Sequence, residues 1–531
     1  MDTTNKNESL KDEREYDTDY EIGQDNIDVL GFDIHNPVFF TSASLVLFFS
    51  LATLIYPETA NSWLTGAQSW TLKKFDWLFA LTPIVAFATC AGLAIAPMGK
   101  VRLGGADAKP DFGYASWIAM LFAAGVGIGY MFYGAAEPLA YYTNWAGAPF
   151  DVEPGTAAAK RLAMSASISH WGILAWAVYA VVGLSLGFFA YNKGLPLTIR
   201  SAFYPIFGDR IWGWPGHIID LLAVVSTIFG LATSIGLGAT QATSGLAYLV
   251  GFSPTVSIQI GLVVIITGAA VISVLRGLDG GVKLLSNINM ALAFSLLIFV
   301  IAFGAGGSFI PALGSNLLGY FKDLPGLTNW IGRSDTTFFH DWTIFYWAWW
   351  VAWAPFVGMF IARISKGRTV REYVLVVLTA PFAIGFVWFT AFGETAISQY
   401  NSGIGDVANG IVDSSLVLFQ MLDSLPLSEV TSVVGIILLL VFITTSADSG
   451  ALVVDAITAG GKTDAPVSQR VFWAIMLGLT ASALLFGGGD QALKSLQAGT
   501  ITAALPFTII LLASCFSLFL GLRDEQRRLT Q

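Results

Sequence analysis

Long runs of apolar residues recur along the whole chain, separated by short polar stretches. A run of about 20 residues is long enough for a helix to cross a hydrocarbon core about 30 Å thick. Twelve such helices are predicted, at residues 38–56, 76–97, 114–142, 161–191, 216–247, 255–275, 283–306, 342–362, 371–397, 430–457, 469–488 and 499–521. The pattern therefore predicts an all-α polytopic membrane protein.

Composition supports this class. Of the 531 residues, 55% are hydrophobic and only 12% are charged, and the mean hydropathy is +0.67. The sequence contains no Walker loop, HExxH motif or nucleophile elbow, and its four histidines and two cysteines are scattered. These are the patterns expected of ATPases, metalloproteases, hydrolases and disulfide frameworks. We therefore predict a protein that is not an enzyme.

Charge is distributed unevenly over the chain. Residues 1–35 carry eleven acidic and three basic side chains, so they are predicted to form a solvated, disordered tail. The densest basic group lies between the eighth and ninth spans, at Arg363, Lys366, Arg368 and Arg371. Because basic residues concentrate in cytoplasmic loops, both termini are predicted to lie in the cytoplasm.

The third span contains the sequence AAGVGIGYMFYGAAEP, in which Gly125, Gly127 and Gly129 alternate. Each glycine disfavours a continuous helix by about 1 kcal/mol relative to alanine. Unwound backbone is tolerated inside a membrane where it lines a site. Residues two apart do not share a helix face, so the spacing favours unwinding over the alternative, a glycine face for helix packing.

The eighth span holds a cluster of tryptophans in the sequence TIFYWAWWVAWAPFVGMF. They lie near the middle of the span, whereas membrane tryptophans usually gather at the two water interfaces. Aromatic faces at this depth favour an onium cation, and packing against other helices is the alternative. The cluster consists of Trp347, Trp349, Trp350 and Trp353.

Pro355 and Gly358 follow this cluster and predict a second interrupted helix. Two spans interrupted in corresponding places indicate an inverted repeat with a binding site between its halves. The predicted organisation is a disordered tail at 1–35, two accessory helices at 36–113, a first repeat at 114–306, a connector at 307–341, a second repeat at 342–521 and a short tail at 522–531.

The tenth span contains the polar motif TTSADS, which includes Thr445, Ser446 and Asp448. Clustered hydroxyl oxygens suit an alkali cation, although such hydroxyls often bond to the backbone of their own helix instead. An intramembrane carboxylate is costly and is usually functional or paired. The motif is therefore a candidate ion site.

The fourth span contains HWGILAWAVY, which is rich in aromatic residues. On a continuous helix, Trp171, Trp176 and Tyr179 could all or mostly lie on one face. Taken alone, such a stripe is more typical of core packing than of a binding site.

Four stretches, in this order, together resemble the betaine/choline/carnitine transporter family: AGVGIGYMFYGAAEP, HWGILAWAVY, FYWAWWVAWAPFVGMFIARISKGRTVRE and TTSADSG. The resemblance covers all twelve spans. It implies a LeuT-like core of two five-helix inverted repeats preceded by two extra helices. It also implies alternating access, transport of onium solutes, and a homotrimer in the bacterial inner membrane.

The same resemblance implies the site residues. An aromatic cage for the onium group would comprise Trp171, Trp176, Tyr179 and Trp350, with Trp349 beside it. The backbone of Gly125, Gly127 and Gly129 would face the substrate carboxylate, and Trp353 and Phe360 would line the inner path. One sodium ion would lie between the carbonyl groups of Ala123 and Val126 and the hydroxyl groups of Thr445 and Ser446.

The resemblance also bears on the coupling ion. Proton-coupled choline carriers of the family have an aspartate where this chain has Gly129, which favours sodium here. The family's second sodium site resembles a threonine pair one helical turn apart, near a phenylalanine of the eighth span. Thr227 and Phe356 match that pattern, whereas Leu231 stands in place of the second threonine and leaves the second site in doubt.

The predicted function is sodium-driven symport of a zwitterionic onium solute, with the sodium ion for coupling and no cofactor. Glycine betaine is the first candidate substrate and dimethylsulfoniopropionate the second. A sodium-independent carnitine/betaine exchanger and a proton-coupled choline carrier are the alternatives. The predicted partners are the solute, the lipid bilayer and further copies of the chain, with no nucleic acid.

Overall fold

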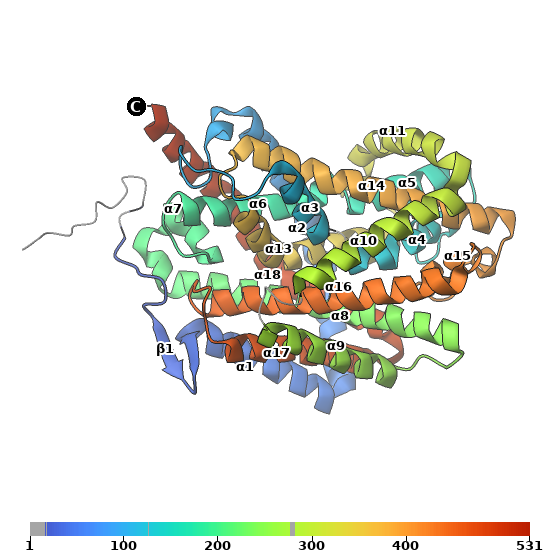
Figure 1. Ribbon diagram of the computed structural model, residues 1–531, viewed down its shortest axis with the longest axis horizontal. Coiled ribbons are helices and arrows are strands. Elements are labelled where there is room, and N and C mark those ends of the chain that lie inside the picture. The colour runs from blue at the N-terminus through green and yellow to red at the C-terminus, as the bar shows by residue number, and fades with distance from the viewer. Residues whose placement is uncertain (1–15, 17, 126, 277–281, 531) are drawn as a thin grey trace, which may run out of the picture.

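The computed structural model describes residues 16, 18–125, 127–276 and 282–530, which form a bundle of long helices (Figure 1). Its first half contains β1 (Asn26–Val29), β2 (Phe32–His35), α1 (Asn36–Ile55), α2 (Pro57–Ile95), α3 (Tyr114–Gly125), α4 (Ile128–Thr143), α5 (Ala157–His170), α6 (Ile173–Tyr191), α7 (Tyr204–Phe207), α8 (Trp214–Val250), α9 (Val256–Arg276) and α10 (Val282–Val300). Its second half contains α11 (Phe309–Thr328), α12 (Thr336–Phe338), α13 (Phe345–Ile364), α14 (Val370–Ser402), α15 (Val417–Asp423), α16 (Ser428–Thr458), α17 (Val467–Gly488) and α18 (Ala492–Thr530).

The prediction of an all-α polytopic membrane protein is confirmed. Within the described residues, eleven helical segments are long and apolar enough to cross a membrane. The third predicted span is absent from that set because it is divided into α3 and α4, neither of which is long enough alone. The hairpin of β1 and β2 and the C-terminus lie at one end of the bundle, and α15 lies toward the other (Figure 1).

The glycine motif interrupts the third span as predicted. Helix α3 ends at Gly125, and α4 begins at Ile128. Gly127 between them is extended, with φ −144° and ψ −161°. Alternating glycines lower the stability of a continuous helix enough for the backbone to leave it.

The predicted break at Pro355 and Gly358 is wrong. Helix α13 runs through both residues without interruption. A Cβ on Gly358 would lie 2.7 Å from Val182 Cγ1 and 3.0 Å from Gly183 N, so this glycine lets α13 pack closely against α6. The backbone irregularity lies earlier, in a π-helical segment at Phe339–Ile344. The third and eighth spans are therefore not interrupted in corresponding places, and the inverted repeat stays a prediction.

The fourth span, expected as one helix, is divided. Helix α5 ends at His170, Gly172 is extended with φ −94° and ψ −158°, and α6 begins at Ile173. Trp171 occupies the junction, so of the three aromatic residues expected on one helix only Trp176 and Tyr179 lie on the same helix, α6. A Cβ on Gly172 would lie 2.6 Å from the Ile168 carbonyl oxygen, which explains why glycine occupies this turn.

The N-terminal segment is more ordered than predicted. Residues 26–35 form an antiparallel hairpin in which Asn26 pairs with His35. Lys462 Nζ lies 2.5 Å from Asp33 Oδ2, and Asn26 donates to the Ala459 carbonyl at 2.9 Å. These contacts hold the hairpin against the loop between α16 and α17. The predicted tail at 522–531 is helical as far as Thr530, because α18 continues to that residue.

His35 ends the hairpin in a buried position against the bundle. Its Nε2 lies 3.2 Å from His217 Nδ1, which in turn lies 3.2 Å from Arg200 Nη1. Burial, followed by the positive charge of Arg200 and by His217, lowers the pKa of His35 to about 3. His35 is therefore neutral at physiological pH, and protonating it would oppose the docking of the hairpin.

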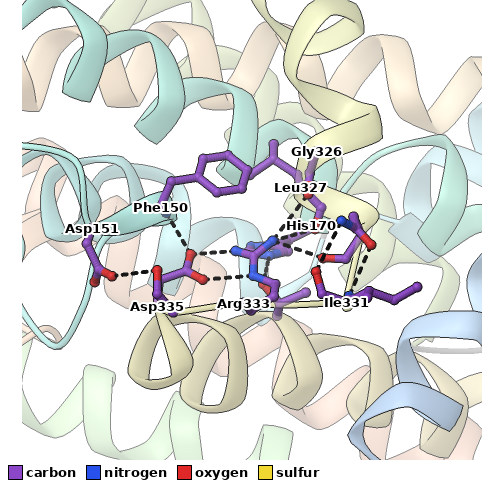
Figure 2. A network of polar contacts seen from close by, with 11 residues as sticks. Phe150, Asp151, His170, Gly326, Leu327, Ile331, Arg333 and Asp335 are labelled. Atoms are coloured by element: carbon purple, nitrogen blue, oxygen red, sulfur yellow. Dashed lines mark hydrogen bonds and ion pairs between the residues drawn. The ribbon is translucent and has the colours of Figure 1, made fainter.

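Arg333 organises the segment before α12 and α13 through a network of polar contacts (Figure 2). Its guanidinium donates two hydrogen bonds to Asp335, at 2.8 and 2.5 Å, and one to the Gly326 carbonyl at 3.2 Å. Asp335 also accepts from the Phe150 backbone N–H at 2.6 Å, and the guanidinium lies 4.8 Å from the Phe150 ring centroid. The network fastens the segment before α13 to the loop between α4 and α5.

Candidate functional site

A pocket lies where the two divided spans meet α8 and α13. It encloses roughly 470 Å³ of space, part of it open to solvent. The structure brings together in its wall eight of the nine predicted substrate-binding residues, and adds Ile128 and Ser234. The lining consists of Gly127, Ile128, Gly129, Trp171, Trp176, Tyr179, Ser234, Trp349, Trp350 and Trp353.

The aromatic rings of this pocket face one another at different angles. The Tyr179 and Trp350 centroids lie 4.7 Å apart, and Trp176 lies 5.5 Å from Tyr179 and 5.8 Å from Trp350. Trp171 lies 5.7 Å from Trp350, with its ring plane inclined by 70°. A cation is attracted by ring faces within about 6 Å, so one onium group here could contact several faces at once.

Gly127 and Gly129 of the pocket wall have different structural roles. A Cβ on Gly127 would meet nothing within 4 Å, so the backbone at this position is open to the pocket. A Cβ on Gly129 would overlap the six-membered ring of Trp171. Gly129 is therefore required by the position of Trp171, whatever the ligand. Any side chain at this position would displace that ring.

Helix α8 holds two indoles of α13 in place. Trp349 Nε1 donates to Ser234 Oγ at 3.2 Å, and Trp353 Nε1 donates to the Gly230 carbonyl at 3.0 Å. The buried indole N–H of Trp176 has no hydrogen-bond acceptor among the described residues. Because a buried donor without a partner is unfavourable, this N–H is available to an oxygen atom of a ligand.

The break between α3 and α4 places helix ends at the pocket. The last four carbonyl groups of α3, which include that of Ala123, have no partner within the helix, and they carry the negative end of the helix dipole. The first N–H groups of α4, beginning at Ile128 in the pocket wall, carry the positive end. Such an arrangement suits a cation on one side and a carboxylate on the other. The predicted ligand Val126 lies outside the described residues.

The predicted hydroxyl ligands lie on α16, which is continuous through the TTSADS motif. Thr445 Oγ1 donates to the Val441 carbonyl at 2.9 Å, which leaves its lone pairs available. A Cβ on Gly238 of α8 would lie 2.5 Å from Ile443 Cδ1 and 3.4 Å from Ile128 Cγ2. The beginning of α4 therefore lies near the stretch of α16 that carries Thr445 and Ser446.

Asp448, the carboxylate of this motif, accepts a hydrogen bond from Ser273 Oγ of α9 at 2.7 Å. This contact gives it a partner away from the pocket.

The residues predicted for a second sodium site lie outside the pocket wall, as does Phe360 of the predicted inner path, whereas Trp353 of that path lies in the wall. Thr227 is buried on α8, and its hydroxyl donates to the Ala223 carbonyl at 2.7 Å. Phe356 is half-buried on α13, with its ring centroid 5.4 Å from that of Trp353. Phe360 is half-buried one turn further along α13.

Sequence reasoning missed three residues of this region. Ser234 and Ile128 reach the pocket only through tertiary packing, and the sequence gives no local signal for them. Glu137 is buried on α4 and accepts a hydrogen bond from Trp171 Nε1 at 2.9 Å. Its signal was present, because a carboxylate within an apolar span is rare and usually has a role.

Comparisons with known proteins identify the family of this chain. Residues 37–527 match the model of the betaine/carnitine/choline family transporters. The chain is 52% identical over 512 residues to glycine betaine transporter 1 of Vibrio parahaemolyticus, covering 96% of this chain and 98% of that protein. A glycine betaine/proline/choline/ectoine transporter of the same bacterium is also 52% identical, with coverages of 96% and 91%.

A glycine betaine transporter of Acinetobacter baylyi is 41% identical, with coverages of 93% and 74%. The match to the family model extends over nearly all of the helical bundle. The chain therefore belongs to the betaine/carnitine/choline transporter family and is a multi-pass membrane transporter, not an enzyme.

Proposed function

We propose that this protein is a sodium-coupled symporter that imports a zwitterionic onium solute by alternating access. Glycine betaine is the first candidate substrate, and dimethylsulfoniopropionate is the second. The observation that carries the proposal is the pocket in which Trp176, Tyr179 and Trp350 surround a space beside the unwound backbone at Gly127.

The chemistry of the pocket supports a solute with both an onium group and a carboxylate. A trimethylammonium or dimethylsulfonium group cannot donate hydrogen bonds, and aromatic faces attract its charge by about 2 kcal/mol when it is desolvated. The N–H groups at the beginning of α4, with the unpartnered N–H of Trp176, offer donors to a carboxylate. Choline has no carboxylate and would leave these donors unused. The names of the three relatives all include glycine betaine.

Two features support sodium as the coupling ion. The carbonyl groups at the end of α3 and the hydroxyl groups of Thr445 and Ser446 would supply neutral oxygen ligands. Gly129 carries no carboxylate that could serve as a proton carrier. A second ion at Thr227 would need a ligand other than Leu231, whose side chain packs on Gly450 of α16.

Sodium and substrate would stabilise the same arrangement of the interrupted α3–α4 backbone. Any increase in substrate affinity caused by sodium must then equal the increase in sodium affinity caused by substrate. We place the protein in the bacterial inner membrane as a homotrimer. Both termini are assigned to the cytoplasm, because the densest basic loop is predicted to lie on the same side of the membrane as the termini.

Uptake of radiolabelled glycine betaine into proteoliposomes tests this proposal. An inward sodium gradient is compared with an equal potassium gradient, and unlabelled dimethylsulfoniopropionate, choline, carnitine and ectoine compete. We expect sodium-dependent accumulation, with dimethylsulfoniopropionate among the strongest competitors. Uptake that ignores sodium but increases when the vesicles contain solute would identify an exchanger and refute symport.

A further inference from the structure

A buried carboxylate lies directly behind the aromatic pocket. Glu137 on α4 is 0% exposed. Its Oε1 accepts a hydrogen bond from the Tyr141 hydroxyl at 2.9 Å and lies 2.7 Å from His170 Nδ1. Its Oε2 accepts from Trp171 Nε1 at 2.9 Å and from the Tyr346 hydroxyl at 2.7 Å. Four polar groups from α4, α5, the α5–α6 junction and α13 thus converge on one carboxyl group.

Nothing in helix packing alone requires a carboxylate at this depth. Carboxylates within membrane spans are costly and are usually paired or functional. Among the described residues, no Lys or Arg side chain lies within 4 Å of Glu137, and its nitrogen neighbour at that distance is the imidazole of His170. The convergence of several donors on two oxygens suits an ionised carboxylate, which can only accept hydrogen bonds.

The carboxylate fixes the position of the Trp171 ring. The indole N–H is held by Glu137, while the six-membered ring lies over Gly129 and reaches the pocket wall. Phe389 of α14 stacks on the indole at 5.6 Å with an interplanar angle of 25°. Trp171 is therefore held by a hydrogen bond at its N–H, by Gly129 at its six-membered ring and by the stacked Phe389 ring on one face.

The same hydrogen bond also changes the charge distribution of the indole. A carboxylate that accepts from the N–H polarises the ring and makes its face more negative, as hydrogen-bonded groups polarise one another in a medium of low dielectric constant. The negative charge of Glu137 also attracts a cation in the pocket directly, with little screening by water.

We propose that Glu137 is a specificity-determining residue that positions Trp171 and supplies the negative charge by which the pocket distinguishes an onium cation from an uncharged group of the same shape. This inference rests on the proposed function, because it assumes that the pocket binds an onium solute.

The test compares two ligands of equal shape in Glu137→Gln and in the wild-type protein. Glycine betaine and 3,3-dimethylbutyrate differ only in that a neutral carbon replaces the positively charged nitrogen. Their inhibition constants are measured by competition against radiolabelled glycine betaine in proteoliposomes. The glutamine side chain keeps the shape of Glu137 and one oxygen acceptor for Trp171, but it removes the charge.

Glu394→Gln is the matched control. Glu394 is also a nearly buried glutamate, on α14, and lies 2.7 Å from Lys160 Nζ and 3.3 Å from Asn316 Nδ2. It does not line the pocket, so this substitution is expected to leave the ratio of the two inhibition constants unchanged.

We expect Glu137→Gln to raise the constant for glycine betaine about tenfold, the effect of losing one charge-assisted interaction, and to change that for 3,3-dimethylbutyrate by less than about twofold. An equal increase for both ligands would show a purely structural role and overturn the inference, as would no change for either. If Glu137→Gln does not fold, the two inhibition constants are measured in Glu137→Asp instead. Aspartate keeps the negative charge, so the ratio of the two inhibition constants should stay at its wild-type value even if both constants rise. Loss of that ratio would overturn the inference.

Wild-type protein that transports no onium solute would refute the proposed function and this inference with it. Wild-type protein that transports glycine betaine, combined with an unchanged ratio in Glu137→Gln, would refute only the inference.

Discussion

Gly129→Ala adds a single methyl group, and we expect it to disrupt the aromatic pocket. An ideal Cβ at this position would lie 2.5 Å from Trp171 Cζ3 and 3.0 Å from Cζ2. Trp171 Cη2 would lie closer still to that Cβ. Carbon atoms in favourable contact lie about 3.5–4.0 Å apart, so the ring must move by at least about 1.5 Å.

The Trp171 ring has little freedom to make that movement. Its N–H is held at 2.9 Å by Glu137, and one face is stacked on Phe389. A movement of this size lengthens the hydrogen bond beyond the usual range. Overpacking of this kind typically costs about 1–3 kcal/mol. If about 2 kcal/mol of it appears as weaker substrate binding, the apparent substrate constant rises about 30-fold.

The assay is concentration-dependent uptake of glycine betaine in proteoliposomes. Gly92→Ala on α2 is the control, because a Cβ there would meet nothing within 4 Å. Adding Trp171→Phe to Gly129→Ala should recover part of the affinity, since a smaller ring relieves the overlap. A substrate constant for Gly129→Ala within about threefold of wild type would refute the reasoning, because a contact this close could not then be present.

Three further predictions concern the cage, the ion site and the N-terminal hairpin. Trp350→Leu removes a central ring face and should raise the substrate constant about 30-fold, equivalent to about 2 kcal/mol; an unchanged constant would exclude this cage. Replacing Thr445 and Ser446 together by alanine should abolish sodium-dependent uptake, and unchanged sodium dependence would remove this ion site. His35 has a lowered pKa of about 3, so below its usual value of 6.5 the undocked hairpin binds a proton that the docked one excludes. Docking should therefore weaken as pH falls, by up to about 1.4 kcal/mol per pH unit. The neighbouring His217, which His35 contacts, is another group that protonation would charge beside Arg200, so part of the effect remains without His35. Hydrogen exchange at residues 26–35, corrected for its intrinsic pH dependence, should therefore change more steeply with pH in wild type than in His35→Gln; equal behaviour of the two would contradict the prediction.

The sequence was sufficient wherever one local property decides the structure. The membrane spans follow from runs of apolar residues, since a helix must satisfy its own backbone in lipid. The break at Gly127 follows from alternating glycines, which weaken a helix without any tertiary contact.

The sequence was insufficient wherever distant segments decide. A single glycine, Gly172, divides α5 from α6, and nothing local distinguishes it from Gly358, which leaves α13 intact and fits against Gly183. The order of the acidic N-terminal segment depends on contacts such as that of Asp33 with Lys462, 429 positions away. The role of Glu137 depends on partners that the fold gathers from four segments.

A crystal structure with an arsonium analogue of glycine betaine would test the central claim most directly, because the anomalous signal of arsenic locates the onium centre. We predict one strong peak within about 6 Å of the ring centroids of Trp176, Tyr179 and Trp350. A peak outside this pocket would contradict the assignment of these rings as the onium site.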